Sequence, residues 1–126
     1  MLESNAISRV LVVDDERIIA DTLALILKQS GFESHAVYSG ETAVEDAMAW
    51  KPDVIISDVV MQGLNGIDAA IRISASLPGC RIILFSGNAV TANLLDHAQA
   101  KGHKFEMLLK PVHPQVILDC LAHSAA

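Results

Sequence analysis

The residues of this chain that could do chemistry stand directly after short apolar runs. Five such side chains follow four of these runs: Asp14, Asp15, Asp58, Ser86 and Lys110. Crowded carboxylates repel one another unless a cation lies among them, and Mg²⁺ is bound by one or two carboxylates together with waters and phosphate oxygens. A carboxylate can also attack a phosphoryl group to form an aspartyl-phosphate, while an ammonium and a hydroxyl group stabilise charge on the phosphoryl oxygens. The set therefore predicts a magnesium-dependent phosphoryl site.

Each of these residues also has a plainer interpretation. Asp14 or Asp15 can cap a helix, and Asp58 can simply end a strand. Ser86 can begin a turn, and Lys110 can be a solvated lysine. These interpretations hold for one residue at a time, but they do not explain why reactive side chains follow one apolar run after another. The convergence favours the phosphoryl site.

These side chains need a scaffold that brings the ends of the runs together. Five runs predict strands at residues 9–13, 35–38, 53–57, 81–85 and 105–109. The first, third and fourth are continuously apolar, which is typical of central strands in a parallel sheet covered on both faces. The second is shorter and more polar, and we expect it at an edge of the sheet.

Helical spacing of apolar residues lies between the strands. It predicts five helices: from residue 18 to a stop at Gly31, over 40–50, from a cap at Asn65 to Pro78, over about 89–100, and from Pro114 onward. Alternating strands and helices predict right-handed crossovers, and therefore a doubly wound, three-layer α/β sheet with parallel strands. Ligands of such sheets bind beyond the carboxyl ends of the strands, where the five reactive side chains would lie.

The composition excludes several other classes of protein. A chain of 126 residues that is 52% apolar is expected to fold as one domain with a well-supplied core. The net charge of −6 argues against nucleic-acid binding by charge, and no apolar stretch is long enough to span a membrane. Cys80 and Cys120 form no CxxC pair, and the chain begins with no secretory signal, so we expect reduced thiols in a cytoplasmic protein. The five histidines lack the spacing of metal ligands.

In their order along the chain, these motifs resemble the receiver domains of bacterial two-component response regulators. The resemblance runs from about Val10 to Leu121 and rests on the acid pair DD, on Asp58 in DVVMQGLNG, on a serine after the fourth strand, and on LKP. It implies a (βα)5 flavodoxin-like fold with the strand order 2-1-3-4-5. It also implies a single receiver domain over residues 1–126, with a core from about 8 to 123.

The resemblance assigns a chemical role to each acid. Asp58 would accept a phosphoryl group from a phosphohistidine. Asp15 and Asp58 would be ligands of Mg²⁺. Asp14 and the backbone carbonyl of Val60 would contribute to the same ion, directly or through water.

The resemblance also assigns the residues around the phosphoryl group. Ser86 and Lys110 would contact it, and Ser86 would move when Asp58 is phosphorylated. The peptide bond between Lys110 and Pro111 is expected to be cis. The family commonly has Tyr or Phe where this chain has Met107, so the resemblance implies a switch in which methionine replaces an aromatic ring.

Two further positions are implied to tune the lifetime of the aspartyl-phosphate, and they hold Val60 and Asn88. Val60 cannot position an attacking water by hydrogen bonding, so we expect a phosphorylated state that decays slowly. Gln62 stands where the family usually has proline. We therefore expect a looser loop there, with its chemistry retained.

The resemblance implies partners on both sides of the switch. A sensor histidine kinase or phosphotransfer protein would supply the phosphoryl group. A downstream output protein or fused domain would bind the face formed by the fourth helix, fifth strand and fifth helix. No direct binding of nucleic acid or membrane by this domain is implied. The domain would catalyse its own phosphorylation and dephosphorylation, but it would turn over no separate substrate.

Two other classes remain as alternatives. A Mg²⁺-dependent phosphohydrolase would also use Asp58 as the nucleophile, but the haloacid-dehalogenase type needs an aspartate two residues later, where this chain has Val60. A flavodoxin-like cofactor binder needs a Ser/Thr/Gly-rich phosphate loop after the first strand, where this chain has DDER. Both alternatives fit the chain less well than a phosphorylation switch.

Overall fold

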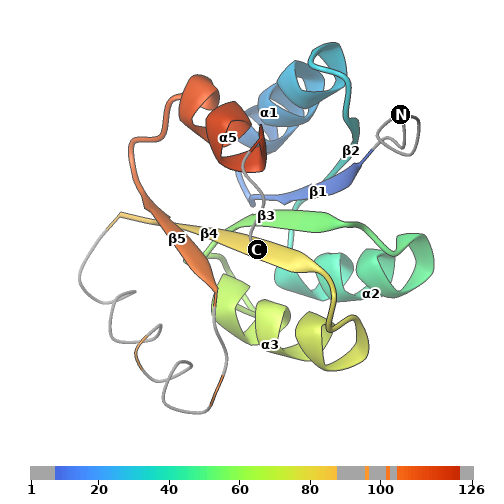
Figure 1. Ribbon diagram of the computed structural model, residues 1–126. Helices are drawn as coiled ribbons and strands as arrows, with labels where there is room; N and C mark the ends of the chain where they lie inside the picture. Colours follow the sequence, from blue (N-terminus) through green and yellow to red (C-terminus); the bar gives the residue numbers. More distant parts are fainter. Residues whose placement is uncertain (1–7, 88–95, 97–101, 103–104, 123–126) are drawn as a thin grey trace.

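A five-stranded parallel sheet forms the centre of the computed structural model, which describes residues 8–87, 96, 102 and 105–122 (Figure 1). The strands are β1 (Arg9–Val13), β2 (Glu33–Val37), β3 (Val54–Asp58), β4 (Arg81–Ser86) and β5 (Glu106–Leu109). Their order across the sheet is β2-β1-β3-β4-β5, and every neighbouring pair is parallel. The fold class and the strand order are confirmed.

Helices cover both faces of the sheet. They are α1 (Arg17–Gln29), α2 (Gly40–Trp50), α3 (Gly66–Ser76) and α5 (Pro114–Ala122). Figure 1 shows α1 and α5 on one face and α2 and α3 on the other. The helix predicted over about 89–100 lies outside the described residues apart from Asp96, and Asn88 lies outside them as well.

The core has two layers because alternate residues of each strand point to opposite faces. Leu11, Ile55 and Leu84 belong to the cluster on the side of α2 and α3. Val12 and Ile56 belong to the cluster beneath α1 and α5. The central strands are thus apolar on both faces, which is the physical reason for their continuous apolar runs.

Two predicted helix signals are present at the expected places. The side chain of Asn65 accepts a hydrogen bond from the Asp68 backbone N–H at 2.8 Å, which satisfies one of the free donors at the start of α3. After α1, Gly31 has φ of 100°, a left-handed conformation that glycine adopts without steric cost. Asn65 thus marks where α3 begins, and Gly31 follows the end of α1 on the way to β2.

Strand β2 differs from its prediction, because it begins two residues earlier than residue 35 and ends one residue before 38. Glu33 pairs with Arg9 of β1 in the ladder, and their side chains form an ion pair at 3.1 Å. The buried Ser34 hydroxyl donates to the carbonyl of Ala24 in α1. Polar residues therefore extend this edge strand through backbone pairing and side-chain bonds that an apolar pattern does not show.

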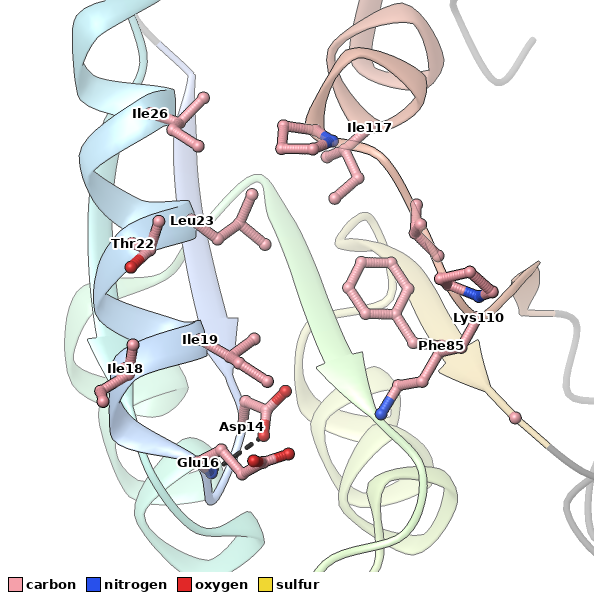
Figure 2. A pocket seen from close by; sticks show the side chains of 14 residues that line it. Asp14, Glu16, Ile18, Ile19, Thr22, Leu23, Ile26, Phe85, Lys110 and Ile117 are labelled. Atoms are coloured by element: carbon pink, nitrogen blue, oxygen red, sulfur yellow. Dashed lines mark hydrogen bonds between the residues drawn. The ribbon is translucent and has the colours of Figure 1, made fainter.

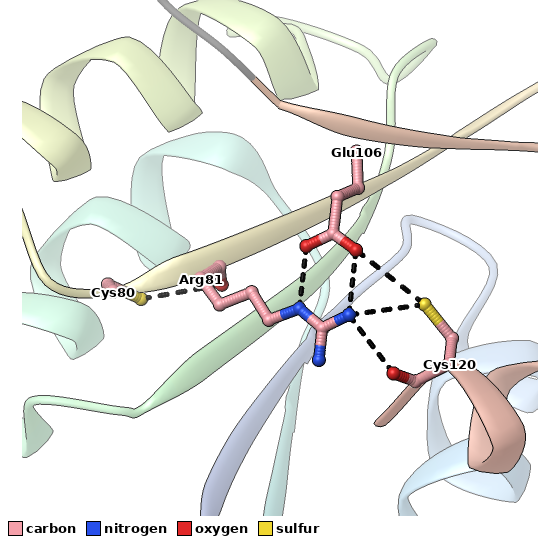
Figure 3. Close-up of polar contacts among 4 residues, drawn as sticks. All are labelled: Cys80, Arg81, Glu106 and Cys120. Atoms are coloured by element: carbon pink, nitrogen blue, oxygen red, sulfur yellow. Dashed lines mark hydrogen bonds and ion pairs between the residues drawn. The ribbon is translucent and has the colours of Figure 1, made fainter. Parts of the chain in front are cut away.

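A polar cluster joins strands β4 and β5, at one edge of the sheet, to α5 (Figure 3). Arg81 of β4 binds the carboxylate of Glu106 in β5 through two bonds, of 2.6 and 2.7 Å. The same guanidinium donates to the backbone carbonyl of Cys120 at 3.0 Å. One arginine thus ties β4, β5 and α5 together, at the end of the strands opposite the reactive side chains.

None of the helices in the described part of the chain combines the length and the apolar character that a membrane crossing requires.

Candidate functional site

The three predicted acids meet at one edge of the sheet. In the ladder Val13 pairs with Ser57, so Asp14 is level with Asp58 on the neighbouring strand. Carboxylate oxygens of Asp14, Asp15 and Asp58 all lie within 4.8 Å of one another. Asp14 and Asp58 are buried, with 4% and 7% of their surface exposed, whereas Asp15 is exposed. The cluster thus has two fixed carboxylates and one that faces solvent.

Lys110 supplies the positive charge of this edge. Its Nζ lies 2.9 Å from Oδ2 of Asp58, and its backbone N–H donates to the carbonyl of Ser86 at 2.8 Å. The Lys110–Pro111 peptide bond is cis. The end of β5 therefore directs a lysine side chain across β4 to the end of β3.

Two serines complete the buried polar edge. Ser86 is the last residue of β4 and has only 3% of its surface exposed. Ser57 precedes Asp58, and its hydroxyl donates to the Asp58 backbone carbonyl at 2.9 Å. The sequence predicted a role for Ser86 but none for Ser57, because a serine inside an apolar run belongs to no recognisable motif.

The electrostatics of the cluster favour a bound cation. Burial is the largest cause that raises the pKa of Asp14, and the neighbouring charge of Asp58 adds to it. The backbone N–H of Glu16, which donates to Oδ1 of Asp14 at 2.9 Å, acts in the opposite direction. Ionised Asp14 therefore lowers the stability of the folded protein when no cation is bound.

The residues present fit Mg²⁺. Three carboxylates face one ammonium group, and carboxylate oxygens are the donors that this hard cation prefers. A divalent ion would offset both the burial of Asp14 and the repulsion between the acids. The donor set therefore supports the predicted metal.

The segment after β3, residues 59–65, carries the predicted carbonyl ligand. Val59 is fully buried, and its carbonyl accepts a hydrogen bond from Gly66 N–H at 2.8 Å, which closes the segment at its base. Val60 is 57% exposed at the start of the segment, two residues after Asp58. A side chain at Gly66 would collide with the Asp58 carbonyl, so this close return requires glycine.

The remaining predicted site residues are placed less fully. Met107 of β5 pairs with Leu84 in the ladder and packs, partly buried, against the core cluster that includes Ile55. Phe105 packs against the same cluster. Asn88 lies outside the described residues, so its role in tuning the lifetime of the aspartyl-phosphate stays a prediction.

A groove of about 790 Å³ opens beside the acids, between α1 and the chain that leads into α5 (Figure 2). Its apolar walls include Ile18, Ile19, Leu23, Ile26, Phe85 and Ile117. Asp14 and Lys110 lie at one end of this groove. Ile18 is 82% exposed, so the groove has an uncovered apolar rim. No sequence motif indicated this groove, because Ile18 and Ile19 fit the ordinary apolar spacing of a helix.

Comparisons with known sequences agree with this geometry. A family model described as the response regulator receiver domain matches residues 10–122. Chemotaxis protein CheY of Thermotoga maritima is 32% identical over 114 residues, which make up 90% of this chain and 93% of that protein. DNA-binding response regulator MtrA of Mycobacterium tuberculosis is 26% identical over 110 residues, which make up 87% of this chain. The chain spans about half the length of MtrA, with 47% covered.

Solved structures resemble the whole described fold. Chemotaxis protein CheY4 of Vibrio cholerae superposes with a TM-score of 0.79 at 28% identity, covering 93% of this chain and 98% of that chain. A response regulator receiver domain protein of Clostridium thermocellum gives a TM-score of 0.82 at 27% identity and covers 92% of each chain. The likeness therefore extends over nearly the full length of all three chains.

Proposed function

The chain belongs to the response regulator receiver domain family, and from this premise we propose that Asp58 is its phosphoacceptor. Members of this family act in two-component signalling. The observation that carries the assignment is the position of Asp58, because its buried carboxylate belongs to the acidic cluster and also pairs with the ammonium group of Lys110. Asp14 and Asp15 share the acidic cluster, but the 2.9 Å ion pair with the lysine is made by Asp58.

The proposed step is a transfer between two residues on different proteins. A carboxylate oxygen of Asp58 forms a bond to phosphorus, and the phosphorus–nitrogen bond of a phosphohistidine breaks. The electron pair of that bond goes to the imidazole of the leaving histidine. Lys110 stays near the phosphoryl oxygens and offsets their charge, while the buried Ser86 offers a hydroxyl donor.

We assign Mg²⁺ as the cofactor of this step. The carboxylates of Asp14, Asp15 and Asp58 and the backbone carbonyl of Val60 would hold the ion, directly or through water. When bound, it neutralises charge between these carboxylates and the phosphoryl oxygens. The protein's own contribution is to keep two of the acids buried and fixed, so that little reorganisation accompanies the transfer.

The phosphorylated state is proposed to act as a switch. A phosphoryl group on Asp58 would draw Ser86 toward its oxygens, and the side chain of Met107 would repack in response. Methionine is flexible and apolar, so this repacking differs from the swing of an aromatic ring. Val60 and Asn88 are assigned the role of setting how long the state lasts.

The phosphodonor is a sensor histidine kinase or a phosphotransfer protein. We propose that it docks in the apolar groove beside the acids. An apolar face of that partner, laid along Ile18 and Ile19, would bring its phosphohistidine to the end of the groove where Asp14 and Lys110 lie. We therefore assign the groove as the binding site of the protein that carries the phosphohistidine. A downstream protein or fused output domain reads the switched state.

We propose that residues 1–126 form one receiver domain of a cytoplasmic signalling protein. Cys80 and Cys120 are free thiols, which suits a reducing compartment. The domain would not bind nucleic acid by itself, because the net charge of −6 opposes contact with phosphates. A phosphohydrolase of the haloacid-dehalogenase type is not favoured, because it needs an aspartate two residues after Asp58, where this chain has the exposed Val60.

Acetyl phosphate tests the proposal without a kinase. The protein is incubated with acetyl phosphate and Mg²⁺, and its intact mass is recorded beside Asp58→Asn, a chelator control and Asp46→Asn, which removes a carboxylate that pairs with His35 away from the site. We expect one added phosphoryl group in the parent and in Asp46→Asn, and none in the other two samples. An adduct of equal yield in Asp58→Asn would reject Asp58 as the acceptor.

A further inference from the structure

The segment 59–65 is held from outside the site by the first turn of α2. Oε2 of Glu41 accepts a hydrogen bond from the backbone N–H of Leu64 at 3.0 Å. The same carboxylate covers Gly63, where a Cβ would lie only 2.7 Å from Oε2. Gly63 also has φ of 76°, which suits glycine. The carboxylate and the segment are thus in direct contact over two consecutive residues.

The start of α2 is itself pressed against this segment. A side chain at Gly40 would collide with the carbonyl oxygen of Leu64. Ser39 caps the helix by accepting from the Thr42 N–H at 3.0 Å. The helix therefore approaches the segment with its N-terminal turn already ordered.

Electrostatics keep Glu41 ionised in this position. The backbone N–H groups of Glu41 itself and of Leu64 lower the pKa of its carboxyl group. A negative charge in the first turn of a helix is also favoured by the helix dipole. The bond to Leu64 is therefore charge-assisted, which makes it stronger than a neutral one.

Two other contacts anchor the segment, and both tie it to the sheet and the core. The base is closed by the bond from Gly66 N–H to the Val59 carbonyl, and Met61 is buried in the core with 8% of its surface exposed. Glu41 adds the anchor at Leu64, on the outer half of the segment. With it, the segment is held both toward β3 and toward α2.

We propose that Glu41 is a positioning residue, which holds the segment 59–65 so that the backbone carbonyl of Val60 stays in place to bind the metal with Asp58. The role assigned to Val60 rests on the proposed function. The contact between Glu41 and Leu64 does not rest on it, because it is made by protein atoms alone.

A simpler electrostatic effect must be separated from positioning. Any lost negative charge near a cation site weakens cation binding through space. Glu41→Gln loses the charge but keeps a side-chain oxygen that can accept from Leu64 N–H, whereas Glu41→Ala loses both. Glu45→Ala removes an exposed glutamate one turn later in the same helix and serves as the matched control.

The experiment measures two quantities in the parent and these three variants. The first is the exchange rate of the Leu64 amide hydrogen without metal, and the second is the Mg²⁺ dissociation constant by calorimetry. In Glu41→Ala we expect faster exchange at Leu64 and Mg²⁺ binding weaker by about three- to tenfold, the effect of one lost hydrogen bond. We expect smaller changes in Glu41→Gln, which keeps a neutral and therefore weaker acceptor, and values near those of the parent in Glu45→Ala.

Four results would overturn the proposal. Exchange at Leu64 that is unchanged in Glu41→Ala would show that the bond does not hold the segment. Faster exchange with unchanged Mg²⁺ affinity would show that the segment does not position a ligand. Equal losses of Mg²⁺ affinity in Glu41→Gln and Glu41→Ala would assign the effect to charge. Absence of Mg²⁺ binding in the parent would reject the metal site of the proposed function and this role with it, while the exchange rates would still report whether the contact exists.

Discussion

Lys110 reaches Asp58 across an intervening strand, with 2.9 Å between its Nζ and the carboxylate Oδ2. The lysine follows β5, the aspartate ends β3, and β4 lies between them. Both side chains are only partly accessible, at 37% for Lys110 and 10% for Asp58. The contact couples the far edge of the sheet to its centre, and it places the positive charge of the site beside the proposed phosphoacceptor.

Replacing this lysine should separate chemistry from metal binding. In Lys110→Ala the acids lose their nearby cation, so we expect Mg²⁺ to bind more tightly than in the parent. The rate of phosphorylation by acetyl phosphate should fall roughly 10²- to 10³-fold, because a charge that stabilises the phosphoryl oxygens is gone. Calorimetry and timed intact-mass measurements test both effects. Lys28→Ala, in the last turn of α1, is the control, and a variant at Lys110 that phosphorylates as fast as this control would contradict the assignment.

Neutralising Asp14 should stabilise the metal-free protein at neutral pH. Burial raises the pKa of Asp14, so the folded state holds its proton more firmly than the unfolded state does, and stability is lost as the pH rises through the folded pKa. The amide introduced by Asp14→Asn carries no charge and keeps an oxygen that can accept from Glu16 N–H.

We therefore expect Asp14→Asn to melt roughly 2–6 °C above the parent at pH 7.5 in the presence of a chelator. The difference should vanish below the ordinary carboxyl pKa of 3.8, where both side chains are neutral. Saturating Mg²⁺ should reverse the order, because it binds the carboxylate. A variant that melts no higher than the parent at pH 7.5 would show that the ionised Asp14 carboxylate does not destabilise the metal-free fold.

The ion pair at the other end of the sheet should have the opposite pH dependence. Hydrogen bonds from Arg81 lower the pKa of Glu106, so the pair stabilises the fold above the ordinary value of 4.5 and loses this effect as the pH falls through the folded pKa. We expect Glu106→Gln to cost about 1 kcal/mol at pH 7, after allowance for solvent screening of a partly exposed pair. Chemical denaturation at pH 7 and pH 3.5 measures the change.

The control for that experiment is Glu33→Gln. Glu33 pairs with Arg9 through a single 3.1 Å contact between well-exposed side chains. Glu33→Gln should therefore lower the free energy of unfolding by less than Glu106→Gln does at pH 7. A larger loss in Glu33→Gln would mean that the bonds from Arg81 to β5 and α5 are not the stronger tie.

The phosphorylated state should be long-lived. Val60 is exposed two residues after Asp58 and cannot orient a water by hydrogen bonding, so we expect a half-life of minutes or more after acetyl phosphate is removed. Val60→Glu offers a carboxylate that can orient water and should shorten the half-life several-fold, whereas Val60→Ala should not. Aliquots quenched over time and weighed intact give the decay, and a parent half-life of seconds with Mg²⁺ present would reject this role.

The sequence predicted the scaffold well where burial dictates the pattern. Strand β1 and helix α2 have the predicted bounds, and the predicted caps at Asn65 and Gly31 are present. Strand β3 begins and ends one residue later than predicted, and β4 ends one residue later, so that Asp58 and Ser86 end strands rather than follow them. A polar residue at a strand end breaks an apolar run before it breaks the backbone ladder, which explains the difference.

The spacing of residues in the sequence did not predict the contacts between side chains that are far apart in the chain. The ion pair of Lys110 with Asp58 depends on the strand order, which came from the resemblance and not from periodicity. The hydrogen bond from Leu64 N–H to Glu41 joins the segment after β3 to the first turn of α2, and no sequence motif links the two. Such contacts depend on how helices pack on the sheet, and exposed polar residues leave no periodic signal of it.

The most direct measurement of the central claim locates the phosphoryl group on the chain. The protein is phosphorylated with acetyl phosphate and Mg²⁺, reduced with borohydride to convert a phosphorylated aspartate to homoserine, digested, and sequenced by tandem mass spectrometry. We expect the conversion at Asp58 and at neither Asp14 nor Asp15. Conversion at one of those two acids, or at none of the three, would contradict this expectation.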